Sequence, residues 1–426
     1  MSSSENNLTS NKKVLLISQN FTPEPTGIGK YNGEMMNWLA SNGHDCTVVT
    51  TYPYYPQWEV QEPYKKKSFW FKKEVIEHVE SNTRTTIHRC PLYVPSNPSG
   101  KKRIIQDFSF WTSMIWKILG FIITRQRFDL IITIAPPFHL GYLGLMLKKR
   151  NGGKVLYHIQ DLQIDAAQEL NMLSSKKLFD IVYKSERNML AKANYVSSIS
   201  TGMVNKIKEK LDREVFLFPN WIDTSYIFPI ESRNELKTNW GYKLDDILFL
   251  YSGAIGEKQA LDHVLLAAEN HIENKSIQFI ICGSGPYKER LMEMTEEKKL
   301  TNVKFLPVQD KALFNEFLNM ADYHLVLQKS KASDLMMPSK LTTILGMGGV
   351  CIATALPGTS MYNLITQYDL GYITEPDNPQ VLSKLIGLLK PNESFLEKRN
   401  NALNFAAQHL DINHVMRAFL TNVELS

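Results

Sequence analysis

Short apolar runs, glycine-bearing loops and helical segments follow one another in the same order in both halves of the sequence. In the first half, the apolar run 14–18, the loop 19–30, a helix over 31–41 and a second apolar run over 46–51 form the first such series. Strands joined through helices run parallel and need helices on the faces of their sheet, so this order predicts a doubly wound α/β fold. We expect the segment 52–107 to be irregular. The further strands that we predict are 130–135, 155–160, 195–199, 215–218, 247–251, 277–282, 303–306, 324–328 and 350–354.

The length of 426 residues exceeds what one hydrophobic core usually serves. Two series of strands therefore predict an α/β protein of two doubly wound Rossmann-like domains that face each other across a cleft. We expect an N-terminal domain over residues 1–218, a linker over 219–241 and a C-terminal domain over 242–399. A last helical segment, 400–426, completes the chain.

Composition and charge exclude several classes of protein. Hydrophobic residues make up 43% of the chain and charged residues 21%, as in ordinary globular proteins. The net charge of +5 is too small to indicate nucleic-acid binding, although it suits an anionic ligand. Four distant cysteines without a Cys-x-x-Cys pair predict reduced thiols and no zinc site. Residues 1–11 lack the apolar stretch of a signal peptide, which favours a cytoplasmic protein.

A positively charged residue occurs at the predicted start of a helix within the segment 333–354, where a positive charge is unusual. Pro338 is tolerated in a first helical turn, and Ser339 is able to cap the free N–H groups there. Lys340 follows in the first turn, where a cation opposes the helix dipole by roughly 0.3–1 kcal/mol unless an anion is bound. A helix N-terminus beside a lysine suits a phosphate group. The alternative is a solvated lysine on a surface helix.

Three loops of the second half, 253–256, 283–285 and 333–340, begin where predicted strands end. Parallel strands end at the same edge of a sheet, so these loops are predicted to build one concave anion site. In the first half, the loop with Gly27 and Gly29 is either a ligand contact or a plain surface turn. Its spacing is not Gly-x-Gly-x-x-Gly, so the dinucleotide-binding fingerprint is absent.

Polar residues also occur at the end of the predicted strand 155–160. His158 lies within this strand and Asp161 is the first residue past it. Open α/β sheets keep their ligand groups at such strand ends. We interpret Asp161 as functional, and for His158 both a structural and a ligand-orienting role stay open.

The apolar segment 108–124 carries Lys117 as its only charge and has basic residues on both sides. A membrane span needs about 20 apolar residues, so this segment is short for one. It is either a buried helix of the first domain or a helix that rests in a membrane interface. Residues 65–127 are rich in basic and aromatic side chains. A peripheral contact of this region with the inner face of the membrane therefore stays an open alternative.

Several short motifs occur along the chain in an informative order and spacing. They are Pro23-x-x-x-Gly27-x-Gly29, Gly43-His44, Pro219-Asn-Trp-Ile-Asp223, Tyr251-Ser-Gly-Ala-Ile-Gly-Glu-Lys-Gln259, Gly283-Ser-Gly-Pro286, Ala321-Asp322 and Pro338-Ser-Lys-Leu341. Together they resemble the GT-B-fold glycosyltransferases of family 4, a retaining and metal-independent group. The resemblance covers nearly the whole chain. The motifs around Lys258 and Lys340 are similar to the branch of colanic-acid-type fucosyltransferases of exopolysaccharide assembly.

The resemblance implies a nucleotide diphosphate sugar bound mainly by the C-terminal domain and an acceptor bound by the N-terminal domain. It implies neither a metal nor a cofactor, and it implies that the segment 400–426 packs back onto the N-terminal domain. The reaction implied is the retaining transfer of a hexose or deoxyhexose, such as fucose, to a glycan or polyprenyl-linked acceptor in exopolysaccharide biosynthesis. Two alternatives stay open: a catalytically silent GT-B-fold scaffold subunit and a nucleotide-sugar 2-epimerase.

Individual positions of this sequence match or depart from the family motifs. Lys258 matches the lysine that holds the donor phosphates, with one residue fewer before it than usual. Ala254 stands where the family has an arginine, and Lys340 is the candidate to share the phosphate role. Asp334 replaces the first residue of the family's Glu-x7-Glu pair, and Thr342 or Thr343 replaces the second, a ribose ligand. The resemblance thus implies the catalytic residues Asp161, Lys258 and Asp334, the donor-binding residues Gly27, Gly29, Gly253, Lys258, Gly283, Gly285, Pro338, Ser339, Lys340, Thr342 and Thr343, and the acceptor-side residues His158 and Asp161.

Overall fold

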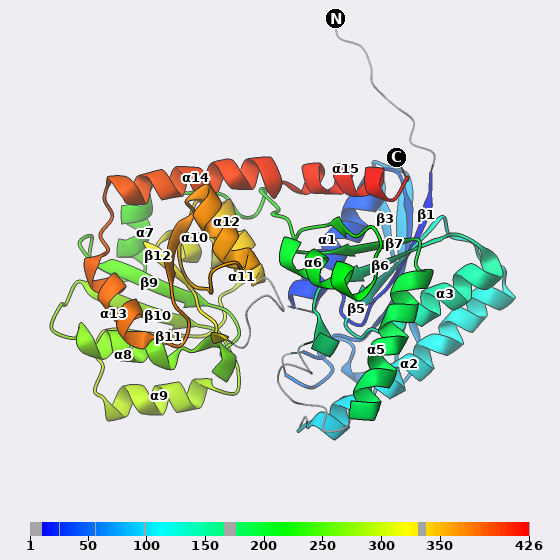
Figure 1. Ribbon diagram of the computed structural model, residues 1–426, viewed down its shortest axis with the longest axis horizontal. Helices are drawn as coiled ribbons and strands as arrows, with labels where there is room; N and C mark the ends of the chain where they lie inside the picture. The colour runs from blue at the N-terminus through cyan, green and yellow to red at the C-terminus, as the bar shows by residue number, and fades with distance from the viewer. Residues whose placement is uncertain are drawn as a thin grey trace, which may run out of the picture. The chain divides into compact units, whose positions relative to one another are not determined.

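The computed structural model describes residues 11–24, 26–55, 57–97, 99–165, 176–330 and 338–425. The chain divides into two compact units (Figure 1). Unit 1 contains the described residues up to Phe218 together with those from Met416 onward, and unit 2 runs from Pro219 to Val415. Each unit has its own parallel sheet with helices on its faces, which confirms the predicted α/β class.

Unit 1 is built on an eight-stranded sheet in the order β3-β4-β2-β1-β5-β6-β7-β8. All neighbours are parallel except β3, which is antiparallel to β4. The central strands are continuous apolar runs because helices cover both of their faces. The strands are β1 (Lys13–Ile17), β2 (Asp45–Thr51), β3 (Lys72–His78), β4 (Thr83–Cys90), β5 (Leu130–Ala135), β6 (Lys154–Ile159), β7 (Tyr195–Ser198) and β8 (Phe216–Leu217).

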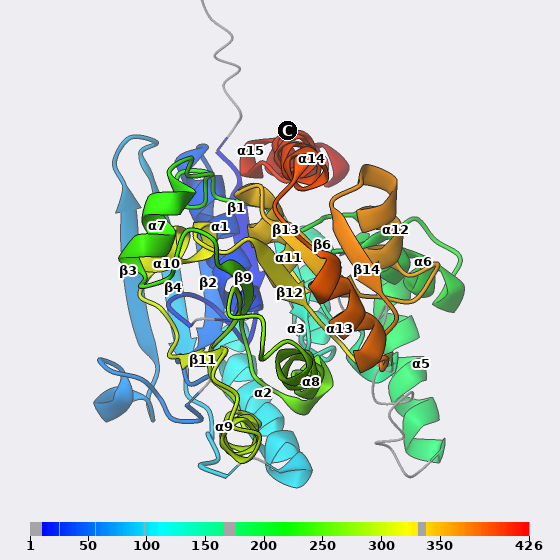
Figure 2. The ribbon, with the colours of Figure 1, turned by 90° about the vertical axis from the view of Figure 1, so that its left-hand side faces the viewer.

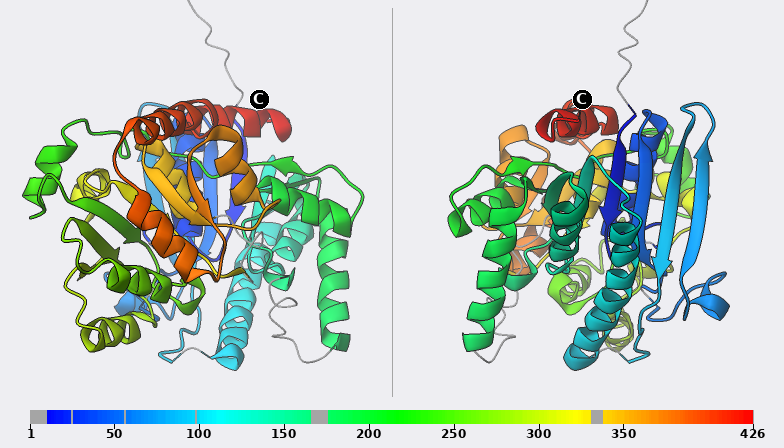
Figure 3. Two further views of the ribbon diagram at one scale, coloured as in Figure 1. Left: turned by 60° about the vertical axis from the view of Figure 1, so that its left-hand side comes forward. Right: turned by 90° about the vertical axis from the view of Figure 1, so that its right-hand side faces the viewer.

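The helices of unit 1 include three long ones, α2, α3 and α5, that lie side by side (Figures 1 and 3). Phe419 near the end of the chain stacks on Phe218 with ring centres 4.4 Å apart, so the last helix completes the core of this unit. The helices are α1 (Gly27–Ser41), η1 (Lys65–Lys67), α2 (Gly100–Ile123), α3 (Leu140–Asn151), α5 (Lys176–Lys192), α6 (Thr201–Lys210) and α15 (Ile412–Asn422), whose first residues belong to unit 2.

The prediction that residues 52–107 are irregular is wrong, because they contain β3, β4 and the start of α2. The sequence of β3 is rich in charge and most of the strand is exposed, so it lacks the apolar run of a central strand. It is the edge strand of the sheet (Figure 3, right). Arg89 of β4 is 2% exposed and holds the hairpin together by donating to Glu74 at 2.9 Å.

Unit 2 is built on a six-stranded sheet in the order β11-β10-β9-β12-β13-β14, and all of its strands are parallel. On one face, the rings of Phe249, Phe279 and Tyr323 stack across three neighbouring strands at 5.2–5.4 Å. The strands are β9 (Ile247–Ser252), β10 (Ile277–Cys282), β11 (Val303–Leu306), β12 (Tyr323–Val326), β13 (Val350–Thr354) and β14 (Gly371–Thr374).

Helices cover both faces of this second sheet (Figure 2). The apolar residues of its strands alternate between two core clusters. Helices α8 and α13 pack on the face with the stacked rings, while α10, α11, α12 and α14 contribute to the opposite cluster. The helices are α7 (Arg233–Asn239), η2 (Glu257–Gln259), α8 (Asp262–Asn270), α9 (Lys288–Glu297), α10 (Lys311–Asn319), α11 (Ser339–Gly346), α12 (Ser360–Tyr368), α13 (Pro379–Leu388) and α14 (Glu393–His409).

The unit boundaries differ from those expected for a linker and a separate last segment. Residues 219–241 contain α7, and Lys237 of this helix pairs with Asp322 at 2.7 Å inside unit 2. Helix α14 also belongs to unit 2, and the chain returns to unit 1 at Met416. Ile222 N donates to Leu410 O at 2.7 Å, so the outgoing and returning segments are paired with each other.

Candidate functional site

The loops after β9 and β10 pack against each other, backbone to backbone. Gly253, Gly283 and Gly285 have φ values of +149°, +148° and +155°, which L side chains rarely adopt. A Cβ atom on Gly283 would collide with the Gly253 carbonyl, and one on Gly285 would collide with the carbonyl of Ile255. These three predicted donor-binding glycines therefore meet at the carboxyl edge of the sheet of unit 2.

The same edge is the point where the strand order of unit 2 reverses. β10 and β11 lie on one side of β9, whereas β12, β13 and β14 lie on the other. Open α/β sheets bind ligands outside the carboxyl ends of their strands at such a switch point. The chain passes from β12 into α11, so the first turn of α11 reaches the β9 loop at this switch.

Among the described residues, no side chain caps the N-terminus of α11. Pro338 occupies the N-cap position without a capping hydrogen bond, and Ser339 is the first helical residue, exposed to solvent. The prediction that Ser339 caps this helix is therefore wrong, because a residue at the first helical position cannot fold back as an N-cap side chain does. The first N–H groups of α11 are left to meet water or an anion.

Lys340 ends in a buried ammonium group that has no hydrogen-bond partner among the described residues. Its Nζ lies 3.5 Å from the centre of the Tyr251 ring and 3.1 Å from where a Cβ on Gly253 would stand. Burial lowers the pKa of Lys340 to about 7, because desolvation disfavours the charged form. A phosphate at this place would supply the missing opposite charge.

Tyr251 is a residue of this candidate site that the sequence analysis did not single out. Its hydroxyl donates to the Ala254 carbonyl at 2.5 Å, which holds the ring flat beneath Lys340 and fixes the β9 loop. An aromatic face attracts a cation by about 0.5–2 kcal/mol, which offsets only part of the desolvation of a buried lysine. The sequence signal that could have identified Tyr251 is its position two residues before the glycine that follows the strand.

Lys258 lies in η2, on the loop that follows β9, and is exposed. Its carbonyl accepts from Lys329 N at 2.9 Å, and the neighbouring Glu257 pairs with Lys329 Nζ at 3.2 Å. These contacts join the η2 loop to the segment that follows β12. Thr342 and Thr343 lie in α11, Thr342 buried and Thr343 half-buried.

The predicted residues of the first half lie in unit 1, and Asp334 lies outside the described residues. His158 is buried in β6, where its Nδ1 meets Ser197 Oγ at 2.9 Å, and burial lowers its pKa to about 3. A neutral, packed imidazole favours the structural role for His158. Asp161 follows β6 at the carboxyl edge of the sheet and is half-buried.

Gly27 and Gly29 form the first turn of α1, which Thr26 caps by accepting from Gly29 N at 2.9 Å. A Cβ on Gly29 would stand 2.8 Å from the Glu24 carbonyl. Glu24 is buried and accepts from Tyr54 N at 3.0 Å, and burial raises its pKa. Its carboxylate anchors this loop to the segment after β2, which favours a tightly built loop over a plain surface turn.

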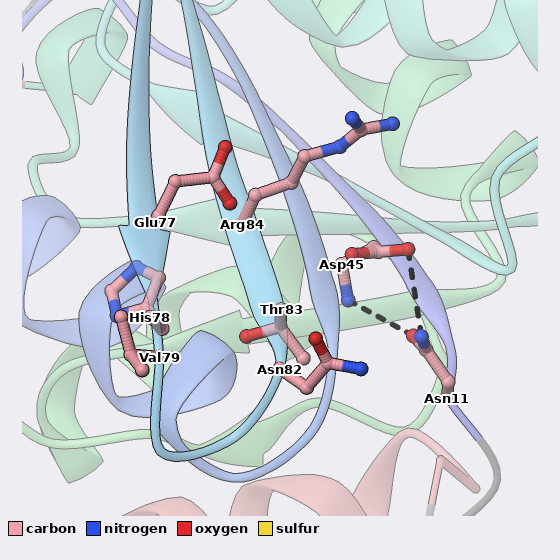
Figure 4. Close-up of a pocket in the computed structure, with 8 residues that line it drawn as sticks. All are labelled: Asn11, Asp45, Glu77, His78, Val79, Asn82, Thr83 and Arg84. Carbon is pink, nitrogen blue, oxygen red and sulfur yellow. Dashed lines mark hydrogen bonds between the residues drawn. The ribbon is translucent and has the colours of Figure 1, made fainter.

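A hollow of about 420 Å³ lies elsewhere in unit 1, at the opposite edge of its sheet (Figure 4). Its lining comes from the starts of β1, β2 and β4 and from the β3–β4 turn. Asn11 and Asp45 bond to each other there, and the Val79 side chain is 88% exposed. The amino ends of parallel strands are not where such sheets bind ligands, so we assign this hollow no function.

Helix α2, which contains the apolar segment 108–124, is buried on one side only. Phe110, Met114 and Ile118 are fully buried, whereas an outer set of apolar side chains is exposed. The exposed set is Ile104, Ile105, Phe108, Trp116 and Ile123.

No helix within the described ranges is long and apolar enough to cross a membrane. Nor do the described residues gather three His, Cys, Asp or Glu side chains that could hold a metal ion.

Comparisons with known proteins cover both units. Residues 26–221 match the family described as glycosyl transferase 4-like domain, and residues 232–409 match the glycosyl transferases group 1. The chain is 35% identical over 426 residues to the putative colanic acid biosynthesis glycosyl transferase WcaI of Escherichia coli K12, covering 96% of this chain and 99% of that protein.

Solved structures resemble the chain over nearly its full length. Sucrose-phosphate synthase from Thermosynechococcus elongatus gives a TM-score of 0.75 at 15% identity, covering 96% of this chain and 98% of that one. Anabaena HepE in complex with UDP and glucose gives 0.69 at 12% identity, with coverages of 97% and 100%. At these identities the likeness concerns the fold alone.

Proposed function

The chain belongs to the glycosyl transferases group 1 family, has the GT-B fold and is a glycosyltransferase, and from this premise we propose that unit 2 binds a nucleotide diphosphate sugar through Lys340. The relative from Escherichia coli, named for colanic acid biosynthesis, places the activity in polysaccharide assembly. The scaffold and epimerase alternatives are set aside because this family transfers sugars.

The observation that carries this proposal is a buried ammonium group without a counter-ion among the described residues. Lys340 Nζ lies at the switch point of the sheet, beside a helix N-terminus that no described side chain caps and beside the glycine loop after β9. Each of these features suits a diphosphate: N–H groups, a positive charge and close approach of the backbone. Lys340 takes the place of the family arginine that Ala254 cannot supply, and Lys258 is the second phosphate ligand.

The chemistry that we propose is a retaining transfer. The bond between C1 of the donor sugar and the phosphate oxygen breaks, and the nucleoside diphosphate leaves with the electron pair. The acceptor oxygen forms the new bond to C1 on the same face and passes its proton to the leaving phosphate. Lys340 and Lys258 stabilise the charge that develops on the phosphate, so no metal ion is required. Asp334 contacts the donor sugar, Thr342 or Thr343 contacts the ribose, and Asp161 orients the acceptor, while His158 keeps the structural role that its burial favours.

Thermal-shift measurements on the purified protein test the donor site. We expect a selective rise of the melting temperature with one of GDP, UDP, dTDP and ADP. The rise is expected to be lost in Lys258→Ala and Lys340→Met. Lys275→Ala is the matched control, because Lys275 precedes β10 at the opposite edge of the same sheet. No response to any diphosphate, or an equal response in all variants, would contradict the proposed donor site.

We further propose a polyprenyl-linked acceptor presented at the inner face of the membrane, with fucose or another hexose as the donated sugar. The exposed apolar side chains of α2, with Phe69 at 77% and Trp70 at 69% exposure nearby in sequence, support a peripheral contact through residues 65–127. Cosedimentation with vesicles that contain anionic lipid tests this. Trp116→Ser and Phe108→Ser should weaken binding, while Val79→Ser, on the exposed β3–β4 turn, should not. Equal binding of all variants would argue against this surface.

A further inference from the structure

Strand β3 is an open edge of the sheet in unit 1. It pairs with β4 on one side, and the described residues place no strand along its other side. Figure 3 (right) shows β3 at the outside of this unit. The backbone N–H and C=O groups on the outer side of an edge strand are available to another strand. Val75 and Ile76, in the middle of β3, are 46% and 47% exposed, so apolar surface lies beside these groups.

One face of β3 carries charges of both signs. Lys73, Val75 and Glu77 lie on this face, because side chains of a strand alternate, and all three are exposed. Neither Lys73 nor Glu77 forms an ion pair within the described part of the chain, unlike Glu74 on the other face. Lys73 instead has a cation near it, since burial and the charge of Lys73 lower the pKa of Lys117. A carboxylate that reached Lys73 from outside would therefore be attracted.

The spacing of these charges fits a second copy of the same strand. When a sheet continues across a two-fold axis, the two edge strands run antiparallel and each residue faces one from the same face of the partner strand. With Val75 opposite Val75, Lys73 of each copy lies opposite Glu77 of the other. The neighbouring symmetric registers lack this match, because one places Glu74 opposite Glu74 and the other places Val75 opposite Glu77. Charge that usually prevents edge pairing is thus complementary here in one register.

We propose that β3 pairs with β3 of a second copy of this chain, which joins the two eight-stranded sheets of unit 1 into one. Two Lys73–Glu77 pairs fix the register, and the Val75 side chains cover each other at the axis. A contact along seven residues is small for a protein interface, so we expect a dissociation constant of about 1–100 µM. The carboxyl ends of the strands take no part in this pairing, and the proposal does not rest on the proposed function.

Sedimentation velocity of the full chain, from about 1 to 300 µM, tests the dimer. Lys73→Glu and Glu77→Lys should each weaken dimerisation at least about tenfold, because both cross-strand pairs change from attraction to repulsion. The double variant restores the pairs with exchanged signs and should dimerise again. Glu80→Lys, which makes the same change of charge just beyond β3, is the control and should leave the dissociation constant unchanged. A protein that stays monomeric, single variants without effect, or a double variant without recovery would overturn the proposal.

Introduced cysteines test the register. The four native cysteines are buried, so an added exposed cysteine is the one that reacts. In Val75→Cys the two thiols lie opposite each other at the axis, and oxidation with copper phenanthroline should join two chains through a disulfide. Ile76→Cys is the matched control, because its exposure is nearly equal but its Cα atoms would lie about 8 Å apart, too far for a disulfide. Equal cross-linking of the two variants, or none in Val75→Cys, would contradict this pairing.

Discussion

Both sheets have a switch point at their carboxyl edge, but the buried groups at the two switch points differ in charge. In unit 2, a helix N-terminus and the buried ammonium group of Lys340, neither of which has a side-chain partner among the described residues, lie against the glycine loop after β9. In unit 1 the corresponding helix α1 is capped by Thr26, and a buried carboxylate, Glu24, is satisfied by backbone N–H groups. An unpaired positive charge favours a phosphate, whereas a carboxylate whose hydrogen bonds are already made adds no attraction for an anion. The difference teaches that similar switch points take their ligand preference from the buried groups that line them.

The largest effect is expected where the two glycine loops of unit 2 touch. Gly283→Ala should lower the free energy of unfolding by roughly 2–4 kcal/mol, since strain at this φ adds to a collision with the Gly253 carbonyl. Diphosphate binding should weaken more than tenfold. Gly241→Ala is the control, because Gly241 also has a positive φ, +80°, but open space around it. Urea unfolding and nucleotide titration check both variants, and equal losses in the two would contradict a role for the contact.

A smaller effect is expected from removing the unpaired charge. Lys340→Met should weaken diphosphate binding by about 10–100-fold, the worth of one charge-assisted contact. Above pH 7, Lys340 loses its proton in the ligand-free protein. Binding of the diphosphate then requires the uptake of a proton, so the affinity of the wild type should fall by at most about tenfold per pH unit. Tyr251 beneath it does not titrate there, because burial raises the pKa of its hydroxyl. Calorimetric titration at about pH 7.5 and 9 checks the slope, which should vanish in Lys340→Met.

In unit 1 the pH dependence should have another origin. Burial raises the pKa of Asp107 to about 6, above its unfolded value of 3.8. The native state therefore binds more protons between these values, and stability falls as the pH rises through 6. Asp107→Asn should be more stable than wild type by roughly 1–2 kcal/mol at pH 7–8 and lose that advantage below pH 4. Urea unfolding across this range checks it, and a constant difference would mean that Asp107 does not titrate in this way.

The smallest effects concern the two helix starts. Thr26→Ala should lower the free energy of unfolding by about 1 kcal/mol, because the Gly29 N–H loses its acceptor. Ser339→Ala should change it by less than about 0.5 kcal/mol, since Ser339 is exposed and caps nothing. Thermal unfolding of both variants measures the contrast. A cost at Ser339 as large as that at Thr26 would show that α11 is capped after all.

The alternation of strands and helices was sufficient to predict most strands of both sheets, because buried parallel strands are continuous apolar runs. It missed β3, a charged edge strand, β4, whose sequence is mostly polar, and β14, which has only four residues. Glycines at 253, 283 and 285 were recognisable from their place after strands, but their mutual contact depends on register between β9 and β10. The ammonium group of Lys340 packs on the ring of Tyr251. These two residues are far apart in sequence, so no local pattern could predict their contact.

The return of the chain to unit 1 at Met416 affects how the protein folds during synthesis. Phe419 and Val423 are buried in unit 1, and Phe419 stacks on Phe218. Unit 1 therefore cannot complete its core when residue 218 leaves the ribosome, but must wait while all of unit 2 is made, roughly 10–40 s at 5–20 residues per second. During that interval Phe218 has the ring of His158 beside it within unit 1 but lacks the stacking of Phe419. We therefore expect the nascent first half to keep this apolar surface exposed until the last residues of the chain are made.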